Sequence, residues 1–209
     1  MFFLASTENQ DQFNIMVRVA QRKDVSELAN TIVACFYDFP PILSWINPLL
    51  KLTISEDLRY RLKNSPLLYC CLVATKNSEI TGAVEISLQK PWWSNSRVPW
   101  QMEHPQGRSS VTAQFPYVSN LAVKNSYRRQ GIATKLLTQC EQISRNWGYQ
   151  EIRLHVLSDN HSAQKLYLGM GYKFIPEATS WYCLLPPYSS RLLMKKELGN
   201  IDEKSTKPT

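Results

Sequence analysis

Short runs of apolar or alternating residues, separated by polar turns, predict the strands of this chain. The longest apolar run, Leu67–Ala74, suits a buried strand and is far too short to cross a bilayer. The polar turn Lys76–Ser78 can join it to the next strand as an antiparallel hairpin. The expected strands are Ile15–Ala20, Leu67–Thr75, Ile80–Leu88, Tyr117–Val123 and Glu151–Val156, with one or two more after Gly171, the last at Leu192–Leu198.

Apolar positions spaced three and four residues apart predict the helices. Asp24 precedes the first helix, where an aspartate can cap it. Pro48 falls inside the second helix and is expected to interrupt it. Gly148 and Gly171 follow the last two helices, at the position where a glycine commonly ends a helix. The expected helices are Val25–Phe36, Leu43–Lys63, Ala133–Trp147 and Ser162–Met170.

The segment Lys90–Pro116 is too rich in proline and tryptophan for a regular element, so we expect a long loop there. Long loops in compact domains are often functional. The chain has 209 residues, which fits one domain over residues 1–198 and a polar C-terminal tail over residues 199–209.

Composition narrows the class of protein but does not name a ligand. Hydrophobic residues make up 44% and charged residues 20%, which argues against a disordered chain and against a membrane protein. The net charge of +7 could favour binding to a nucleic acid, a membrane surface or an anionic ligand. The Lys and Arg residues are spread along the chain, which makes nucleic-acid binding a minor option. Met1–Ala5 lacks the features of a secretory signal. We therefore expect a protein of the cytoplasm, or of the plastid stroma if the source is a plant, with no nucleic acid or membrane partner.

The five cysteines form no CxxC pair, so reduced and mostly buried thiols are expected. Cys70 and Cys71 are adjacent and would point to opposite faces of a strand. None of the three histidines stands at ligand spacing from a cysteine, and no metal site is predicted.

The stretch Tyr127–Thr134 lies between an expected strand and an expected helix, where a chain can bind phosphate. Backbone N–H groups at a helix start have no partner within the helix, and the helix dipole favours negative charge there. Gly131 would let the backbone approach a ligand closely, and Ala133 keeps the next turn narrow. Arg128 and Arg129 could add charge-assisted hydrogen bonds. A helix with a nearby glycine and exposed arginines would fit this short pattern equally well.

Arg128, Gly131 and Ala133 match the R/Q-x-x-G-x-G/A pyrophosphate loop of the GNAT acetyltransferases, so the chain resembles this superfamily. Val118–Val123 resembles the family's fourth strand, and Asn160–Phe174 is similar to its N-x-x-A-x-x-L-Y-x-x-x-G-Y-x-F segment. The resemblance implies an α/β (α+β) GNAT fold. Such a fold has a mostly antiparallel mixed sheet of about six or seven strands and about four flanking helices, splayed between strands four and five.

The same resemblance extends to Leu193–Leu198, which looks like the family's last strand, and it implies acetyl-CoA as co-substrate without a metal. The pyrophosphate would contact the loop, and the pantetheine arm would contact the fourth strand and Asn160. Asn160 could also act as the N-cap of the helix that follows it. The residues implied to contact acetyl-CoA are Leu121, Ala122, Val123, Arg128, Arg129, Gln130, Gly131, Ile132, Ala133, Thr134, Asn160, Ala163 and Tyr167.

Acetyl transfer to an amine needs a neutral nitrogen, stabilisation of the oxyanion and an acid for the departing thiolate. The resemblance makes Tyr167 the acid, although a core tyrosine is the alternative. Related bacterial enzymes that acetylate ribosomal-protein N-termini use as base a glutamate five positions before the motif asparagine, and His155 stands there in this chain. An imidazole can accept a proton, yet a strand histidine bonded to its neighbours fits equally well. Glu85 is a weaker candidate base, because glutamates on strands are more often solvated than catalytic. A backbone N–H of Leu121–Val123 is the implied oxyanion donor.

The sequence defines the amine that accepts the acetyl group less closely than it defines the cofactor. The pattern looks closest to cyanobacterial and plastid-type GNAT proteins, which implies transfer to protein α-amines or lysines by a monomer or homodimer. Deprotonating lysine at neutral pH costs about 3 kcal/mol more than deprotonating an α-amine, which favours α-amines. A small-amine acetyltransferase, a non-catalytic acyl-CoA-binding module and an interaction scaffold are the alternatives. The aromatic residues that could wall a peptide groove, or simply pack a core, are Tyr37, Phe39, Trp45, Trp92, Trp93, Trp100, Trp181 and Tyr188.

Overall fold

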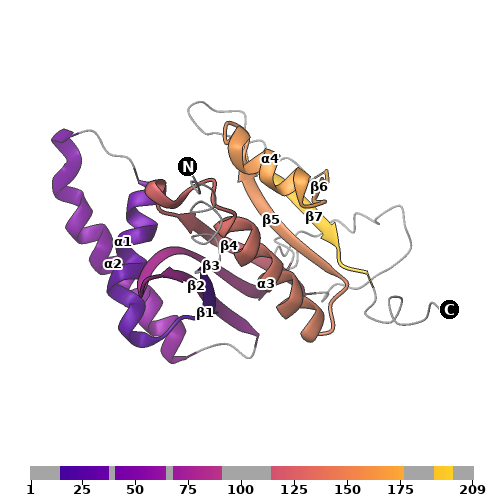
Figure 1. Cartoon of the computed structure of the whole chain (residues 1–209), viewed down its shortest axis with the longest axis horizontal. Coiled ribbons are helices and arrows are strands. Elements are labelled where there is room, and N and C mark those ends of the chain that lie inside the picture. Colours follow the sequence, from indigo (N-terminus) through magenta and orange to yellow (C-terminus); the bar gives the residue numbers. More distant parts are fainter. Residues whose placement is uncertain (1–14, 38–40, 65–67, 91–113, 177–190, 200–209) are drawn as a thin grey trace, which may run out of the picture.

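The computed structural model describes residues 15–37, 41–64, 68–90, 114–176 and 191–199, and one seven-stranded sheet organises them (Figure 1). The strands follow the order β1-β2-β3-β4-β5-β7-β6 across the sheet. Neighbours β4 and β5 run parallel, and the other neighbouring pairs are antiparallel. The bounds are β1 Met16–Val19, β2 Tyr69–Lys76, β3 Glu79–Gln89, β4 Phe115–Val123, β5 Glu151–Leu157, β6 Lys173–Phe174 and β7 Arg191–Glu197.

Helices cover both faces of this sheet, and the alternation of side chains along the strands explains why. Leu72 and Val84 point to one face, where they pack with the core of α3 and α4. Cys71 and Val73 point to the other face, where they pack with α1 and α2. The helices are α1 Val25–Phe36, α2 Asn47–Lys63, α3 Ile132–Asn146 and α4 His161–Gly169, and the 3-10 turns are η2 Arg22–Asp24, η3 Pro41–Ile46 and η5 Asn125–Tyr127.

The expected fold class is confirmed: a mixed, mostly antiparallel sheet with four α-helices among the described residues. The predicted hairpin is also present, and Asn77 and Ser78 form its two-residue turn with φ of 51° and 68°. Positive φ at both turn residues matches the twist of the flanking strands. The loop predicted over Lys90–Pro116 ends two residues earlier than expected, because β4 begins at Phe115. Residues 91–113 lie outside the described part of the chain.

The expected splay between β4 and β5 is present. The two strands pair only at Tyr117 with Arg153 and at Val118 with Leu154. Beyond these two pairs, β4 continues along β3, and β5 continues along β7. The sheet is therefore open between the second half of β4 and the end of β5.

The expectation that Asp24 caps the first helix is wrong. Its side chain makes no capping hydrogen bond to α1. Instead, its two oxygens accept from the Arg18 guanidinium at 2.6 and 2.9 Å, and Oδ2 also accepts from the Gln21 backbone N–H at 2.7 Å. A bidentate pair with an arginine is stronger than a single bond to a backbone N–H, and it ties β1 to the start of α1.

Pro48 does not interrupt the second helix, contrary to expectation. It lies in the first turn of α2, where proline's missing N–H would have had no helical partner. The preceding residues form the separate turn η3. None of the helices within the described ranges is long and apolar enough to cross a membrane.

Candidate functional site

The loop before α3 has the backbone geometry that its sequence suggested. Gly131 is the N-cap residue of α3 with φ of 75°, and Arg129 also has a positive φ of 64°. The first helical bond here runs from the Lys135 N–H to the Gly131 carbonyl at 3.0 Å. The N–H groups of Ile132, Ala133 and Thr134 therefore have no acceptor within the helix. Apart from its chain neighbours, a Cβ at Gly131 would meet no atom of the described residues within 4 Å, so this side of the loop is open toward them.

Two side chains tie the loop to the rest of the fold. The Lys124 ammonium lies 2.9 Å from Glu79 and 3.2 Å from Glu27 of α1. The Tyr127 hydroxyl donates to Glu79 at 2.7 Å, and the Lys124 backbone N–H donates to the Thr81 carbonyl at 2.9 Å. These contacts fix the loop against the β2–β3 hairpin.

Gly82 on β3 allows the close packing that brings α3 to this position. A Cβ there would lie 2.9 Å from the Ala122 carbonyl oxygen and 3.1 Å from Ile132 Cγ2. Sequence analysis missed this residue. A glycine inside a strand pattern often marks a close approach of two backbones, and that signal was available.

Arg128 is exposed and points back along the chain. Its Nε donates to the Val123 carbonyl at 3.3 Å. It also lies beside Cys35 of α1, whose Sγ donates to the same carbonyl at 3.4 Å. Burial raises the pKa of the Cys35 thiol, and the Arg128 guanidinium partly offsets that rise.

Tyr117 and His155 meet where β4 and β5 separate. The Tyr117 hydroxyl lies 2.8 Å from His155 Nδ1, and the two ring centroids are 5.6 Å apart. Both side chains are half-buried. Their strand neighbours Val118, Leu154 and Val156 belong to the core beneath α3, so Tyr117 and His155 face the side that carries α1 and α2. Sequence analysis named His155 but not its partner Tyr117.

Tyr167 approaches the same opening from the opposite face of the sheet. It lies in α4, is 7% exposed, and packs against Tyr172 with ring centroids 5.9 Å apart. Burial raises the pKa of Tyr167 to about 12, and the nearby Tyr117 hydroxyl contributes to the rise. The phenol therefore stays protonated throughout the neutral and moderately alkaline range. Its role as an acid stays a prediction.

Asn160 is the N-cap of α4. Its side-chain oxygen accepts from the Ala163 N–H at 3.1 Å, which is one of the two alternatives that the sequence allowed. Its side chain is exposed, so the amide nitrogen can still reach solvent or a ligand. The contact with the CoA arm stays a prediction.

Glu85 occupies a different environment from the one expected. It is 2% exposed, although a solvated strand glutamate seemed the usual case. Its Oε1 accepts from Asn120 Nδ2 at 2.7 Å, and its Oε2 accepts from the Tyr69 hydroxyl at 2.8 Å and from the Arg61 guanidinium. Burial and the Glu85 carboxylate raise the pKa of Tyr69 well above its usual value, so the phenol remains a donor.

Asn120, which sequence analysis also missed, forms a β-bulge in β4. Ala83 opposes Ala122 and Glu85 opposes Ser119, so Asn120 and Leu121 together stand against one residue of β3. Asn120 has φ of 52°, in the left-handed region that asparagine tolerates better than most residues. An asparagine in the middle of an apolar strand was the available signal.

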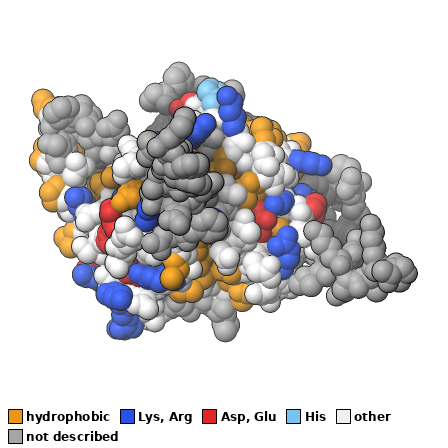
Figure 2. All heavy atoms as spheres, in the orientation of Figure 1, with side chains coloured by type: hydrophobic (Ala, Val, Ile, Leu, Met, Phe, Trp, Pro, Cys, Tyr) orange, Lys and Arg blue, Asp and Glu red, His pale blue; other side chains and the backbone are white. Residues whose placement is uncertain are grey.

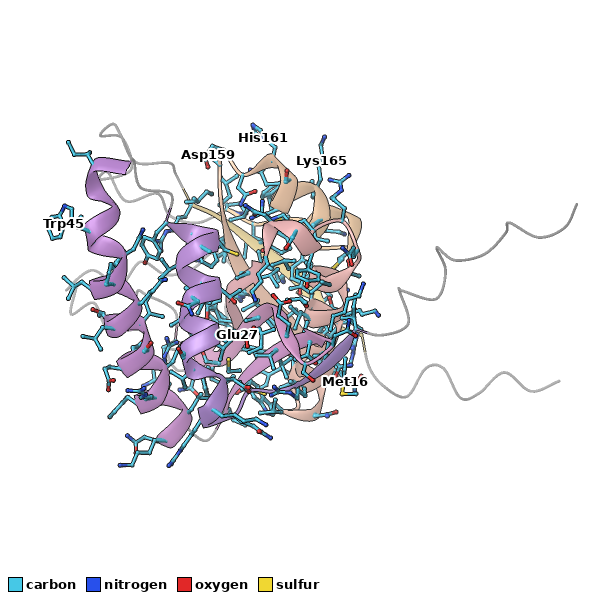
Figure 3. The ribbon with its side chains drawn as sticks, turned by 60° about the vertical axis from the view of Figure 1, so that its left-hand side comes forward. Met16, Glu27, Trp45, Asp159, His161 and Lys165 are labelled. Atoms are coloured by element: carbon cyan, nitrogen blue, oxygen red, sulfur yellow. The ribbon has the colours of Figure 1, made fainter. Side chains whose placement is uncertain are left out.

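The predicted aromatic groove is tested only in part. Tyr37 ends α1, and Trp45 is 69% exposed on η3, where Figure 3 shows it pointing away from the body of the protein. Phe39, Trp92, Trp93, Trp100, Trp181 and Tyr188 lie outside the described residues.

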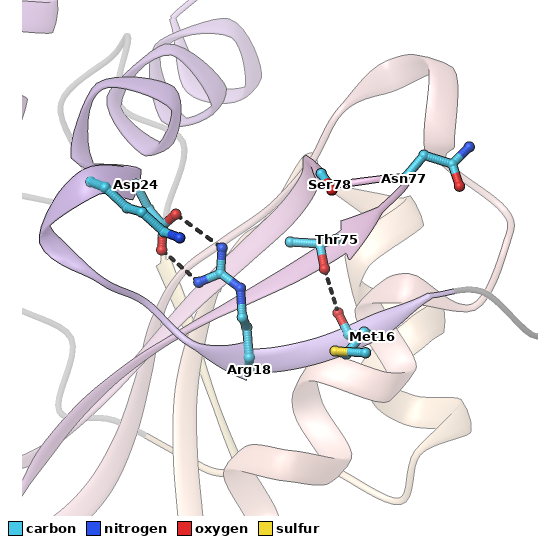
Figure 4. Close-up of a pocket in the computed structure, with 7 residues that line it drawn as sticks. Met16, Arg18, Asp24, Thr75, Asn77 and Ser78 are labelled. Atoms are coloured by element: carbon cyan, nitrogen blue, oxygen red, sulfur yellow. Dashed lines mark hydrogen bonds and ion pairs between the residues drawn. The ribbon is translucent and has the colours of Figure 1, made fainter.

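A surface hollow lies beside β1 and involves none of the predicted site residues (Figure 4). Its only guanidinium among the described residues, that of Arg18, already pairs with Asp24. The basic side chains on the face in Figure 2 lie at several separate places rather than in one patch. No group of three or more His, Cys, Asp or Glu residues within the described ranges could hold a metal ion.

Comparisons with known proteins agree with this geometry. A model of the acetyltransferase (GNAT) family matches residues 33–172. A relative from Arabidopsis thaliana, named GCN5-related N-acetyltransferase 10, chloroplastic, is 32% identical over 161 residues. That match covers 70% of this chain and 56% of the relative, so the chain spans little more than half of the relative's length.

Two solved structures share the fold. The PaiA N-acetyltransferase of Thermoplasma acidophilum, in complex with coenzyme A, matches with a TM-score of 0.59 and 21% identity, over 88% of this chain and 98% of that one. Arabidopsis thaliana Naa50, in complex with the bisubstrate analogue CoA-Ac-MVNAL, matches with a TM-score of 0.56 and 17% identity, over 88% and 99% of the two chains.

Proposed function

Because the chain belongs to the acetyltransferase (GNAT) family, we propose that it transfers the acetyl group of acetyl-CoA to a primary amine, most favourably an amine of a protein or peptide. The observation that carries the proposal is the opening between β4 and β5. The Tyr117–His155 pair lies on one face of this opening and Tyr167 comes from the other. A base and an acid on opposite faces suit a reaction in which the acceptor and the thioester arrive from opposite sides.

The loop before α3 suits the pyrophosphate of acetyl-CoA. The N–H groups of Ile132, Ala133 and Thr134 can donate to phosphate oxygens, and the open space at Gly131 leaves room for them. The exposed guanidiniums of Arg128 and Arg129 and the Gln130 amide can add polar contacts. The pantetheine arm would follow Leu121–Val123, with Asn160 and Ala163 on its other side.

Three side chains would carry the proton transfers of the reaction. With Nδ1 as the acceptor, an amine proton can pass through the Tyr117 hydroxyl to His155, so the two residues form a relay. The free amine attacks the thioester carbonyl, and a backbone N–H of Leu121–Val123 stabilises the oxyanion. When the carbon–sulfur bond breaks, Tyr167 donates its proton to the thiolate of coenzyme A. Tyr167 then regains a proton from solvent, and His155 releases to solvent the single proton that the amine nitrogen lost. The products are an amide and free coenzyme A.

A protein or peptide acceptor is supported by the fold shared with Naa50, whose bound analogue joins coenzyme A to the peptide MVNAL. The acceptor would approach on the face that carries α1 and α2, because Tyr117 and His155 point to that face. The relative from Arabidopsis is named chloroplastic, which supports a plastid location if this chain comes from a plant.

Intact-mass measurement with purified protein and acetyl-CoA tests the proposal. Three matched peptides serve as acceptors: one with a free N-terminus and no lysine, one with a blocked N-terminus and one lysine, and one with neither amine. Mass gain on the first or the second, but not on the third, is the expected result and names the nitrogen. A small primary amine serves as a fourth acceptor, and if it alone is acetylated, the protein acceptor is wrong. If acetyl-CoA binds and no amine gains mass, the chain is an acyl-CoA-binding module instead.

A further inference from the structure

We propose that Glu85 is a positioning residue for acetyl transfer: through Asn120 it holds the bulge that sets how β4 faces the reaction site. This inference rests on the proposed function. It concerns a partly buried polar cluster that links α2, β2, β3 and β4 around the buried Glu85 carboxylate, formed by Arg61, Tyr69, Glu85 and Asn120.

The bulge decides which way the side chains of β4 point. Tyr117 opposes Ser87 and Ala122 opposes Ala83, and directly opposed residues lie on the same face of a sheet. Tyr117 and Ala122 therefore share the α1 and α2 face, although their spacing in a regular strand would put them on opposite faces. The extra residue at Asn120 makes this possible. Without the extra residue, one of two changes would follow. Either the Tyr117 side chain would turn away from His155, or Val123 and the loop after it would change position.

The backbone by itself does not favour the bulge at Asn120, because a left-handed conformation is unfavourable for a residue other than glycine. The bond from Asn120 Nδ2 to Glu85 Oε1, at 2.7 Å, supplies the missing preference. Glu85 cannot easily move away, since Tyr69 and Arg61 hold its other oxygen and the carboxylate is almost fully buried. The cluster thus ties the conformation of one β4 residue to three other elements.

Positioning and general-base roles for Glu85 predict different results. If Glu85 positions Asn120, Glu85→Gln should keep most of the activity, because its amide oxygen can still accept from Asn120. Glu85→Ala should lose about tenfold to a hundredfold in kcat, the range expected for a small displacement of reacting groups. The shape of the pH profile should stay unchanged in both variants. If Glu85 is the base, the glutamine variant should be as inactive as the alanine variant, and the profile should lose its acidic limb.

A second variant acts on the other partner. Asn120→Gly keeps the left-handed conformation accessible but removes the bond to Glu85. We expect kcat to fall about tenfold, with a smaller rise in KM for acetyl-CoA, because the loop at Gly131 is intact and only the contacts along residues 121–123 are disturbed.

Glu141→Gln is the matched control for a purely structural effect. Glu141 is also buried and pairs with Lys196 at 2.7 Å, but this pair links α3 to β7 away from the bulge. All variants are assayed at a temperature where circular dichroism shows them folded. The control should lose stability and keep its kcat. A folded Glu85→Ala with the control's kcat would overturn the inference.

Hydrogen exchange provides a readout that does not need activity. Amides of residues 119–123 should exchange faster in Glu85→Ala than in Glu141→Gln, since only the first variant releases the bulge. Equal protection in the two variants would refute the positioning role even if the unmodified protein acetylated no amine. Inactive unmodified protein together with faster exchange in Glu85→Ala would refute the proposed function and leave the structural role of Glu85 supported.

Discussion

The middle of β4 and the loop that follows β4 obtain their shapes in different ways. In the loop, Gly131 has a positive φ of its own and needs no contact to keep it. In the middle of β4, Asn120 has a positive φ only 11 positions earlier, and a buried carboxylate from β3 holds it. The conformation at Gly131 is thus encoded locally, whereas the conformation at Asn120 depends on a residue far away in the sequence.

This difference suggests that one region governs the binding of acetyl-CoA and the other governs turnover. Under the proposed function the loop would offer backbone N–H groups to the phosphates of acetyl-CoA, so changes there should alter its binding. The opening between β4 and β5 brings Tyr117, His155 and Tyr167 together, so changes there should alter turnover. Variants that change KM without kcat, or kcat without KM, test this assignment.

The largest effect is expected for Tyr167→Phe. Removing the phenol removes the proton donor for the thiolate, and kcat should fall about 100-fold or more while acetyl-CoA still binds. Because the pKa of Tyr167 is raised to about 12, unmodified protein should show no loss of kcat from this group between neutral pH and about pH 10. Steady-state kinetics across pH and calorimetric titration with coenzyme A check both statements. Unchanged turnover in the variant would remove the acid role.

A smaller effect on turnover is expected for His155→Asn. Loss of the proton acceptor should lower kcat about 10- to 100-fold and flatten the acidic side of the pH profile of kcat/KM. Tyr117→Phe should have a weaker effect in the same direction, since it breaks the bond to Nδ1 but leaves the imidazole. An unaltered pH profile in His155→Asn would show that another group accepts the proton.

Gly131→Ala should act on binding rather than on turnover. An alanine forced to a positive φ costs about 1–2 kcal/mol, so the start of α3 should reorganise and KM for acetyl-CoA should rise about tenfold. Gly148→Ala is the matched control, because Gly148 also has a positive φ and open space around it but follows the far end of α3. Equal KM values in the two variants would contradict a role of the loop in binding.

The smallest effect on activity is expected at Asp24, which lies away from both regions. The pKa of Asp24 is lowered in the folded protein, mainly by its hydrogen bond to Arg18. The bond therefore stabilises the fold fully at pH values above the pKa of the unfolded carboxyl. This stabilisation is lost as the pH falls through the lower pKa of the folded state. Asp24→Asn should therefore lose about 1–3 kcal/mol of unfolding free energy at pH 7 and approach the unmodified protein below about pH 4. Urea unfolding at several pH values measures this, and kcat should not change. A constant stability difference at every pH would argue against the ion pair.

Local patterns in the sequence were sufficient to predict most elements and the backbone geometry of the loop before α3. Periodicity located each helix and most strands within a few residues, because the spacing of apolar positions reflects which face is buried. Gly131 and the residues around it were recognisable because a positive φ at a helix start is a property of a single residue. The splay and the mostly antiparallel mixed sheet followed from the family resemblance, not from the spacing of residues.

Tertiary structure decided the rest. Asp24 bonds Arg18 instead of capping α1, since the sheet brings an arginine to it. His155 acquired Tyr117 as a partner only when β4 and β5 came together from distant parts of the sequence. Glu85 looked like a solvated strand residue until α2 placed Arg61 over it. Arg18 and Asp24 are close in the sequence but belong to different elements, and the other contacts join residues that are distant along the chain. A sequence pattern that spans one element carries no information about which side chains of other elements will meet it.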